Sequence, residues 1–211
     1  MSRRTGTPTG AATTRRVEPA GGRDARIDAD RPPPPARELG PRAGDIVSAA
    51  RHLLEDEGVD ALTMRRLAAE LGVKAPSLYK HLPGKGAIEV VLIEQGFTEL
   101  GVALRAAVHG RTPADALRPL LATYRAMALD HPNLYRLVTT GRLPRDELVA
   151  GLEDWAGEPF GLVVDDPEVG RALWSAAHGM AILELDGRYP PDADLDLTWA
   201  RTADAFAATV G

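Results

Sequence analysis

Cysteine is absent from this chain of 211 residues. Without thiols there is no disulfide framework, no thiolate zinc site and no cysteine nucleophile. Long apolar runs are also missing: the longest uncharged apolar-rich run of the C-terminal half covers 172–183, too short for a helix to cross a bilayer of about 30 Å. Neither early arginine pair is followed by the apolar segment of an export signal. We expect a soluble, cytoplasmic protein without a membrane partner.

Motifs of common catalytic sites are missing as well. The chain contains no Gly-x-Ser-x-Gly elbow, no Gly-x-x-x-x-Gly-Lys-Ser/Thr phosphate loop and no His-Glu-x-x-His zinc motif. His178 has no second histidine three or four residues away that would complete a metal pair. We therefore expect no enzyme, no metal and no cofactor. Turnover that depends on a carboxylate, for example Glu184, would be needed to support an α-helical enzyme instead.

Lysine is scarce, and charge is distributed unevenly. Only Lys74, Lys80 and Lys85 occur, all within 12 residues, and residues 1–44 carry nine arginines against five acids. Residues 87–211 carry ten basic and 19 acidic side chains, and the whole chain has a net charge of -5. An acidic body with a locally cationic front end is compatible with a polyanionic partner, although charges clustered on a solvated face would produce the same pattern.

The N-terminal segment differs in composition from the rest of the chain. Residues 1–40 are rich in Gly, Pro, Thr, Arg and Asp, contain four consecutive prolines and show no apolar periodicity. This composition predicts a disordered, Arg/Pro-rich tail with a stiff polyproline stretch.

Apolar residues recur at helical spacing through the remainder of the chain. A first helix is predicted between Asp45 and Gly58, a second between the N-cap Thr63 and Gly72, and a short third over 74–81. Every later segment also has a helical pattern, with no strand-like alternation and no repeat of 20 to 50 residues. The sequence therefore predicts an all-α fold.

The second helix, a turn at 71–73 and the third helix have the spacing of a helix-turn-helix. At 100° per residue, Ala75, Leu78 and Leu82 share one side of the third helix and can pack inward. A small hydroxyl, a ring and a cation on the opposite side suit the DNA major groove, and flanking polar residues suit its phosphates. The outward and flanking residues are Pro76, Ser77, Lys80, Tyr79 and His81.

Several stretches of this region carry a family likeness: Ala50-Arg51-His52-Leu53-Leu54, Gly58, residues 62–68, Leu71-Gly72-Val73, and residues 77–82 followed by Lys85. Together they resemble the DNA-binding domain of tetracycline-repressor-like (TetR) regulators. The Leu-Tyr-x-His step with a lysine four residues later is unusual outside that family. Residues 174–179 also resemble the Trp-x-x-x-His-Gly signature of one of its C-terminal subgroups.

The resemblance implies a three-helix helix-turn-helix domain over 41–86 and a helical ligand-binding and dimerisation domain over 87–211. It implies a ligand-responsive transcriptional regulator, expected to be a repressor that a small molecule releases from a double-stranded, palindromic DNA operator. The implied DNA contacts are Arg65 and Ser77 to bases, Thr63, Tyr79, His81 and Lys85 to phosphates, and Lys74 and Lys80 with no target assigned.

Apolar and aromatic side chains of the C-terminal domain are candidates for the effector pocket. At helical spacing such residues are more often ordinary core, and His178 fits a hydrogen-bonded core or interface histidine better than a metal ligand. The alternative function is an all-α small-molecule carrier whose helix-turn-helix is only structural, and DNA binding discriminates the two. The candidate ligand residues are Phe97, Leu100, Leu104, Tyr124, Met127, Tyr135, Trp155, Trp174 and His178.

Two apolar stripes near the C-terminus alternate steps of three and four residues. We expect segments 167–187 and 195–210 to pair with their copies in a second protomer, which gives a homodimer with a four-helix interface. A two-fold axis would match a palindromic operator. The stripes are Val169, Leu173, Ala176, Met180 and Leu183 in the first segment, and Leu195, Trp199, Thr202, Phe206 and Val210 in the second.

Overall fold

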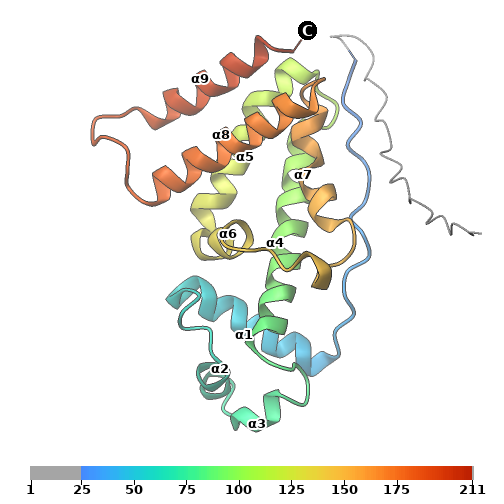
Figure 1. Ribbon diagram of the computed structural model, residues 1–211, viewed down its shortest axis with the longest axis vertical. Helices are drawn as coiled ribbons and strands as arrows, with labels where there is room; N and C mark the ends of the chain where they lie inside the picture. Colours follow the sequence, from blue (N-terminus) through green and yellow to red (C-terminus); the bar gives the residue numbers. More distant parts are fainter. Residues whose placement is uncertain (1–24, 211) are drawn as a thin grey trace, which may run out of the picture.

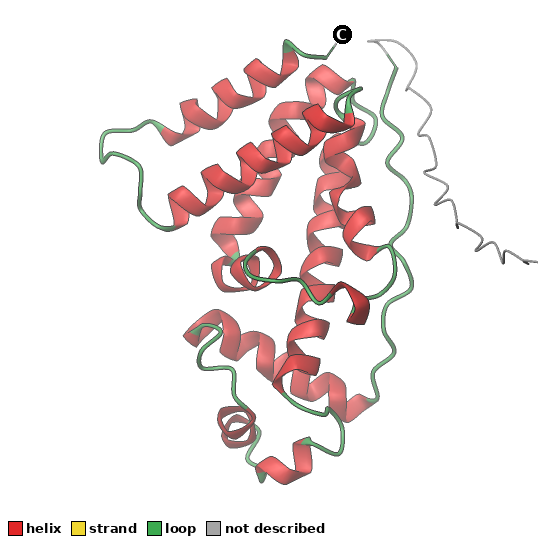
Figure 2. Ribbon diagram, viewed as in Figure 1, coloured by secondary structure: helices red, strands yellow, loops and turns green. Residues whose placement is uncertain are grey.

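The computed structural model describes residues 25–210, and all regular secondary structure in that range is helical (Figure 1, Figure 2). The predicted all-α class is therefore confirmed. None of the helices between residues 25 and 210 is long and apolar enough to span a membrane.

Three helices form a small headpiece, residues 41–84, at one end of the molecule (Figure 1). They are α1 (Pro41–Glu57), α2 (Met64–Glu70) and α3 (Ala75–Leu78). The hydroxyl of Thr63 caps α2 by accepting the N–H of Arg66 at 3.1 Å, as the sequence predicts. Gly72 has a φ of 63° in the turn before α3, a conformation that side chains with a Cβ rarely adopt.

The remaining helices form the body, with α4 (Lys85–Val108) as the link to the headpiece. α4 contacts α5 (Pro113–Asp130), α6 (Pro132–Thr139) and α7 (Leu152–Leu162). A 3-10 turn, Arg145–Glu147, lies between α6 and α7. On the far side of α5 lie α8 (Pro167–Leu185) and α9 (Leu195–Ala207) (Figure 1).

Buried apolar side chains form two cores that share α4. The first packs the headpiece onto the near half of α4 through residues such as Ile46, Leu78 and Ile88. The second surrounds the far half of α4 and includes Leu104 and Tyr124. α4 therefore contributes to both cores and joins the headpiece to the body.

The prediction of a disordered tail is wrong for the part of it that the structure describes. Residues 1–24 lie outside the described residues, whereas residues 25–40, here called the strap, run along the body to α1 (Figure 1). Ile27 is buried and pairs its backbone N–H with Arg111 at 2.8 Å, and its carbonyl accepts the N–H of Gly110 at 2.9 Å. The carbonyl of Arg31 accepts the indole N–H of Trp155 at 3.0 Å. These contacts offset the loss of conformational entropy on ordering the strap, which a segment of this composition cannot offset by itself.

Two charged residues of α4 are buried, and both contact the strap. The carboxylate of Glu94 accepts two hydrogen bonds from Arg37, at 2.8 and 2.9 Å, and the N–H of Val149 at 2.9 Å. The hydrogen bonds to Glu94 raise the pKa of Arg37. Arg105 donates to the carbonyl of Ala29 in the strap at 3.4 Å and to that of Trp155 at 2.9 Å, and it forms an ion pair with Glu158 of α7. A buried charge needs such partners, so the strap is part of the folded body.

Candidate nucleic-acid interface, ligand core and interdomain groove

Helix α3 is anchored to the headpiece by one side only. Leu78 and Leu82 are buried against the first core, and Ala75 is half-buried beside them, as the sequence predicts. Tyr79, immediately after α3, leaves 53% of its surface exposed. A single turn of helix fixed from beneath presents its other side to solvent, which is the geometry that a major-groove reader requires.

Six of the eight predicted DNA-contact residues have exposed side chains in the headpiece. Arg65 is exposed and forms no side-chain hydrogen bond or ion pair with residues 25–210, whereas its neighbour Arg66 bridges Glu57 and Glu70 at 2.6 and 2.8 Å. Arg66 is therefore committed to the fold and Arg65 is available to a partner. The other exposed members of the set are Thr63, Lys74, Tyr79, Lys80 and His81.

Two members of the set are partly engaged within the chain. The hydroxyl of Ser77 donates to the carbonyl of Lys74 at 2.7 Å, so its acceptor lone pairs remain for a donor on a base. The ammonium of Lys85 donates to the carbonyl of Val59 at 3.0 Å and lies 3.5 Å from Glu89. Lys85 thus ties α4 to the loop that follows α1.

The predicted ligand residues are distributed over both cores. Phe97 and Trp155 belong to the first core, and Leu104, Tyr124 and Tyr135 to the second. Leu100, Met127 and His178 are half-buried, and 45% of the surface of Trp174 is exposed. Their role as ligand contacts stays a prediction, and none of them lines the groove between the strap, α1 and α4.

Four of these side chains form a chain of contacts from the second core to the surface. The hydroxyl of Tyr135 lies 3.0 Å from that of Tyr124 and 2.8 Å from Nδ1 of His178, and Trp174 stacks on the imidazole. Burial raises the pKa of Tyr124 well above its ordinary value and that of Tyr135 to about 12, and it lowers the pKa of His178. These four side chains are therefore uncharged at neutral pH. Residues 25–210 contain no cluster of His, Asp and Glu able to hold a metal ion.

The apolar stripes of α8 and α9 are only partly available to a second protomer. Leu173 and Trp199 are buried in the chain's own core, where Trp199 donates its indole N–H to Glu184 at 2.9 Å, so their prediction as interface residues is wrong. The helical period places the buried row against α5 and a different row outside. The large apolar residues exposed on these two helices are Trp174, Leu183 and Leu197.

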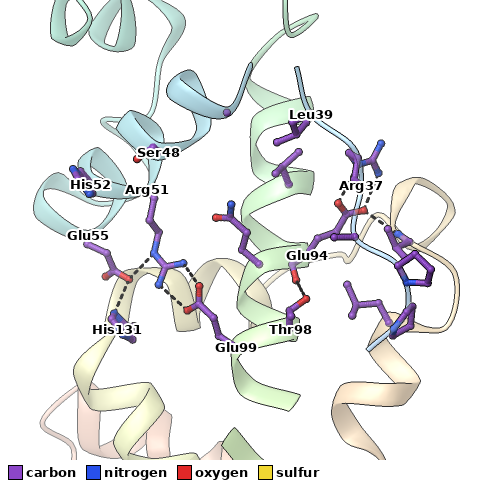
Figure 3. Close-up of a pocket in the computed structure, with 18 of the residues that line it drawn as sticks. Arg37, Leu39, Ser48, Arg51, His52, Glu55, Glu94, Thr98, Glu99 and His131 are labelled. Carbon is purple, nitrogen blue, oxygen red and sulfur yellow. Dashed lines mark hydrogen bonds and ion pairs between the residues drawn. The ribbon is translucent and has the colours of Figure 1, made fainter. Parts of the chain in front are cut away.

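A groove of about 870 Å³ lies between the headpiece and the body and is here called the interdomain groove. Its walls are the strap, α1 and α4, and its ends reach His131 and the segment before α7 (Figure 3). Sequence patterns miss it because its lining comes from five separate segments. Its lining includes Pro35, Arg37, Leu39, Gly44, Arg51, Glu55, Asp56, Val91, Glu94, Glu99, His131, Val149 and Leu152.

Comparison with known sequences matches both parts of the chain. The family described as bacterial regulatory proteins, tetR family, matches residues 46–90, and the tetracyclin repressor-like C-terminal domain matches residues 117–206. The HTH-type transcriptional regulator Rv0681 of Mycobacterium tuberculosis is 31% identical over 176 residues, which cover 77% of this chain and 78% of that protein. The class D tetracycline repressor of Escherichia coli is 44% identical over 43 residues, 20% of each chain. The likeness of residues 174–179 to a Trp-His-Gly subgroup stays a prediction.

Solved structures share the fold. A protein with unknown function from Rhodococcus sp. RHA1 aligns with a TM-score of 0.70 at 24% identity, covering 82% of this chain and 97% of that one. A bacterial regulatory protein in the tetR family from Rhodococcus RHA1 aligns with a TM-score of 0.61 at 19% identity, covering 82% and 98%.

Proposed function

The chain belongs to the TetR family of bacterial regulatory proteins, and from that premise we propose that it is a homodimeric repressor that acts in the cytoplasm and leaves a palindromic operator when a small molecule binds. One observation carries the DNA-binding part: Arg65, Lys74, Tyr79 and Lys80 are exposed around α3 while Leu78 anchors that helix from beneath. Cationic side chains and a phenol hydroxyl around an anchored helix can contact the bases and phosphates of a DNA duplex.

The direct test is binding of the purified protein to DNA from upstream of its own gene, followed by fluorescence anisotropy. A repressor should bind that fragment in preference to a scrambled one, and its affinity should fall steeply with salt because phosphate contacts release counterions. Equal or absent binding to both fragments would favour the alternative function, a small-molecule carrier whose headpiece is only structural.

Arg65→Ala should weaken binding to the preferred fragment by about 1 to 3 kcal/mol. The affinity for the preferred fragment should then be closer to the affinity for the scrambled fragment. The reason is that Arg65 is free of partners in the described chain and can pair with a base edge. Anisotropy titrations of both fragments measure the change. Arg66→Ala is the matched control, since it breaks ion pairs within the headpiece and should lower stability more than base preference.

The homodimer is supported by the apolar surface of α8 and α9. Leu183→Glu and Leu197→Glu should convert a dimer to a folded monomer at micromolar concentration, because both leucines are about half exposed within the chain and charges are excluded from interface centres. Sedimentation velocity measures the state, and far-UV circular dichroism reports the fold. Leu129→Glu is the control: this leucine of α5 is 40% exposed and lies outside α8 and α9. A wild-type monomer, or an equal effect at Leu129, would contradict the proposed interface.

Release by a ligand is proposed to run through α4, which crosses both cores. A ligand that binds unequally to two orientations of the headpiece shifts their populations, and only one separation of the two recognition helices fits successive major grooves. A variant of TetR from Acinetobacter baumannii has been solved in complex with minocycline, which supports the binding of a small molecule by a protein of this fold.

A further inference from the structure

We propose that the interdomain groove binds a protonated amine attached to an apolar body, and that this ligand is the effector of the regulator. The second clause rests on the proposed function, whereas the first stands on the groove alone. With a volume of about 870 Å³, the groove falls within the range of small-molecule sites.

The apolar part of such a ligand would lie along the strap side of the groove. Pro35 and Leu39 of the strap face this space, together with Val91 of α4. Val149 and Leu152, at the start of α7, continue the apolar lining. The strap is held in place by the bonds of Arg37 to Glu94, so this wall is part of the folded protein.

The charged part would lie at the α1 side, where acids outnumber bases. Arg37 is paired with Glu94, and Arg51 binds both oxygens of Glu99 at 3.0 Å, so these four charges balance within the groove. Glu55, which lies 3.7 Å from Arg51, and Asp56 remain, with His52 and His131 beside them, so the carboxylates of the groove outnumber its guanidinium groups. An excess of carboxylates repels an anion and attracts a cation.

Glu55 offers a specific acceptor in that region. Its Oε1 atom is buried and accepts no hydrogen bond from residues 25–210, although Arg51 and His131 lie at 3.7 and 3.5 Å. Figure 3 shows the carboxylate between these two side chains at one end of the groove. A primary ammonium supplies three N–H donors, whereas a quaternary ammonium supplies none, so the geometry favours a primary amine.

Binding there would act on the contacts that join the headpiece to the body. Arg51 of α1 bridges to Glu99 of α4, Glu55 lies against His131, and Asn133 donates to the carbonyl of Glu55 at 3.0 Å. An ammonium that competes for Glu55 and Glu99 weakens the hold of α4 and α6 on α1. The orientation of the headpiece then depends on occupancy of the groove, which is the differential interaction that release of DNA requires.

Three eight-carbon probes with the same chain and different head groups test the site: octylamine, 1-octanol and octanoate. Isothermal titration calorimetry on the full chain at neutral pH should rank octylamine first, at least tenfold tighter than 1-octanol, with octanoate weakest. Equal affinity for the three probes would overturn the proposal, because the chain alone would then account for binding.

Two substitutions locate the binding. Gly44 lines the groove, and a Cβ added there would meet no atom within 4 Å, so Gly44→Leu adds bulk at the wall of the groove with room for its first side-chain carbon. This substitution should weaken the binding of octylamine at least tenfold. Glu55→Gln should lower the affinity for octylamine to that for 1-octanol. Gly157→Leu is the matched control: this glycine of α7 is exposed, also has open space beside it and lies outside the groove. Unchanged octylamine binding in folded Gly44→Leu would overturn the proposed site.

Titrations with DNA separate this inference from the proposed function. If octylamine is an effector analogue, it should weaken operator binding, and operator should weaken octylamine binding by the same factor. Octylamine could bind in a way that Gly44→Leu abolishes and yet leave the affinity for DNA unchanged. That result would support the proposed site and overturn its role as the effector site. Failure of the protein to bind any DNA would overturn the proposed function. The calorimetry would still show whether the groove binds an amine.

Discussion

Alanine in place of Arg37 is expected to lower the free energy of unfolding by about 2 to 4 kcal/mol, because one partner of a largely buried ion pair is removed. Glu94 has a side-chain exposure of 8% and would keep only the N–H of Val149 as a donor. The partial exposure of Arg37 itself, 40%, places the value below that of a fully buried pair. Urea unfolding followed by circular dichroism measures the change.

Arg31→Ala is the control for this experiment. Arg31 is also a strap arginine, but its ion pair with Glu158 at 3.3 Å lies at the surface, so its loss should cost less than about 1 kcal/mol. Glu94→Gln in the Arg37→Ala background should restore part of the lost stability by removing the unpaired charge. Equal effects of the two arginine substitutions would mean that the strap is held by its backbone alone.

The helices of the headpiece could be predicted because their signals are local. Thr63 caps α2, Gly72 turns the chain, and Leu78 lies on the inward side of α3, each as the spacing of residues indicates. These features depend on neighbours within one or two turns. The predicted DNA-contact surface rests on the same local pattern, since residues that are not on the buried side of a helix face outward.

The strap could not be predicted because its stability comes from distant partners. Its composition is that of a disordered segment, yet Arg37 meets a carboxylate 57 positions later in the chain and the carbonyl of Arg31 meets an indole 124 positions later. One signal was present in α4: Val90, Val91 and Phe97 lie at helical spacing around Glu94, so the sequence places this carboxylate in an apolar row of the helix. A buried charge requires a partner: the strap supplies Arg37 to Glu94, whereas Arg105 pairs with Glu158 of α7 and receives only a backbone carbonyl from the strap.

The interdomain groove escaped prediction for a related reason. Aromatic residues such as Tyr124 and Trp155 attract attention as candidate ligand contacts, but they are also the best core residues, and here they are fully buried. A groove between two packed units is lined by what their surfaces leave uncovered, including Gly44 and Glu55. Periodicity describes which side of a helix is buried and carries no information about such gaps.

Gly101→Ala is expected to destabilise the protein by about 3 kcal/mol, at the upper end of the usual cost of overpacking. A Cβ at this position of α4 would lie 2.2 Å from a ring carbon of Trp155. The ring cannot retreat, because it is 1% exposed, its N–H is bound to the strap and the guanidinium of Arg105 covers its face at 4.7 Å. The gain in helix propensity from glycine to alanine, about 1 kcal/mol, is smaller than this clash.

Two comparisons identify the clash as the cause. Gly157→Ala should stabilise the protein by up to about 1 kcal/mol, because this helical glycine is exposed and its Cβ would meet open space. In a Trp155→Leu background, where the ring is gone, Gly101→Ala should cost far less than in the wild type, a non-additivity that a double-mutant cycle of urea unfolding measures. If Gly101→Ala lowered the free energy of unfolding equally in both backgrounds, the close approach of α4 and α7 at Gly101 would not be what holds these helices together. The helix that links the headpiece to the body would then be held by its other contacts.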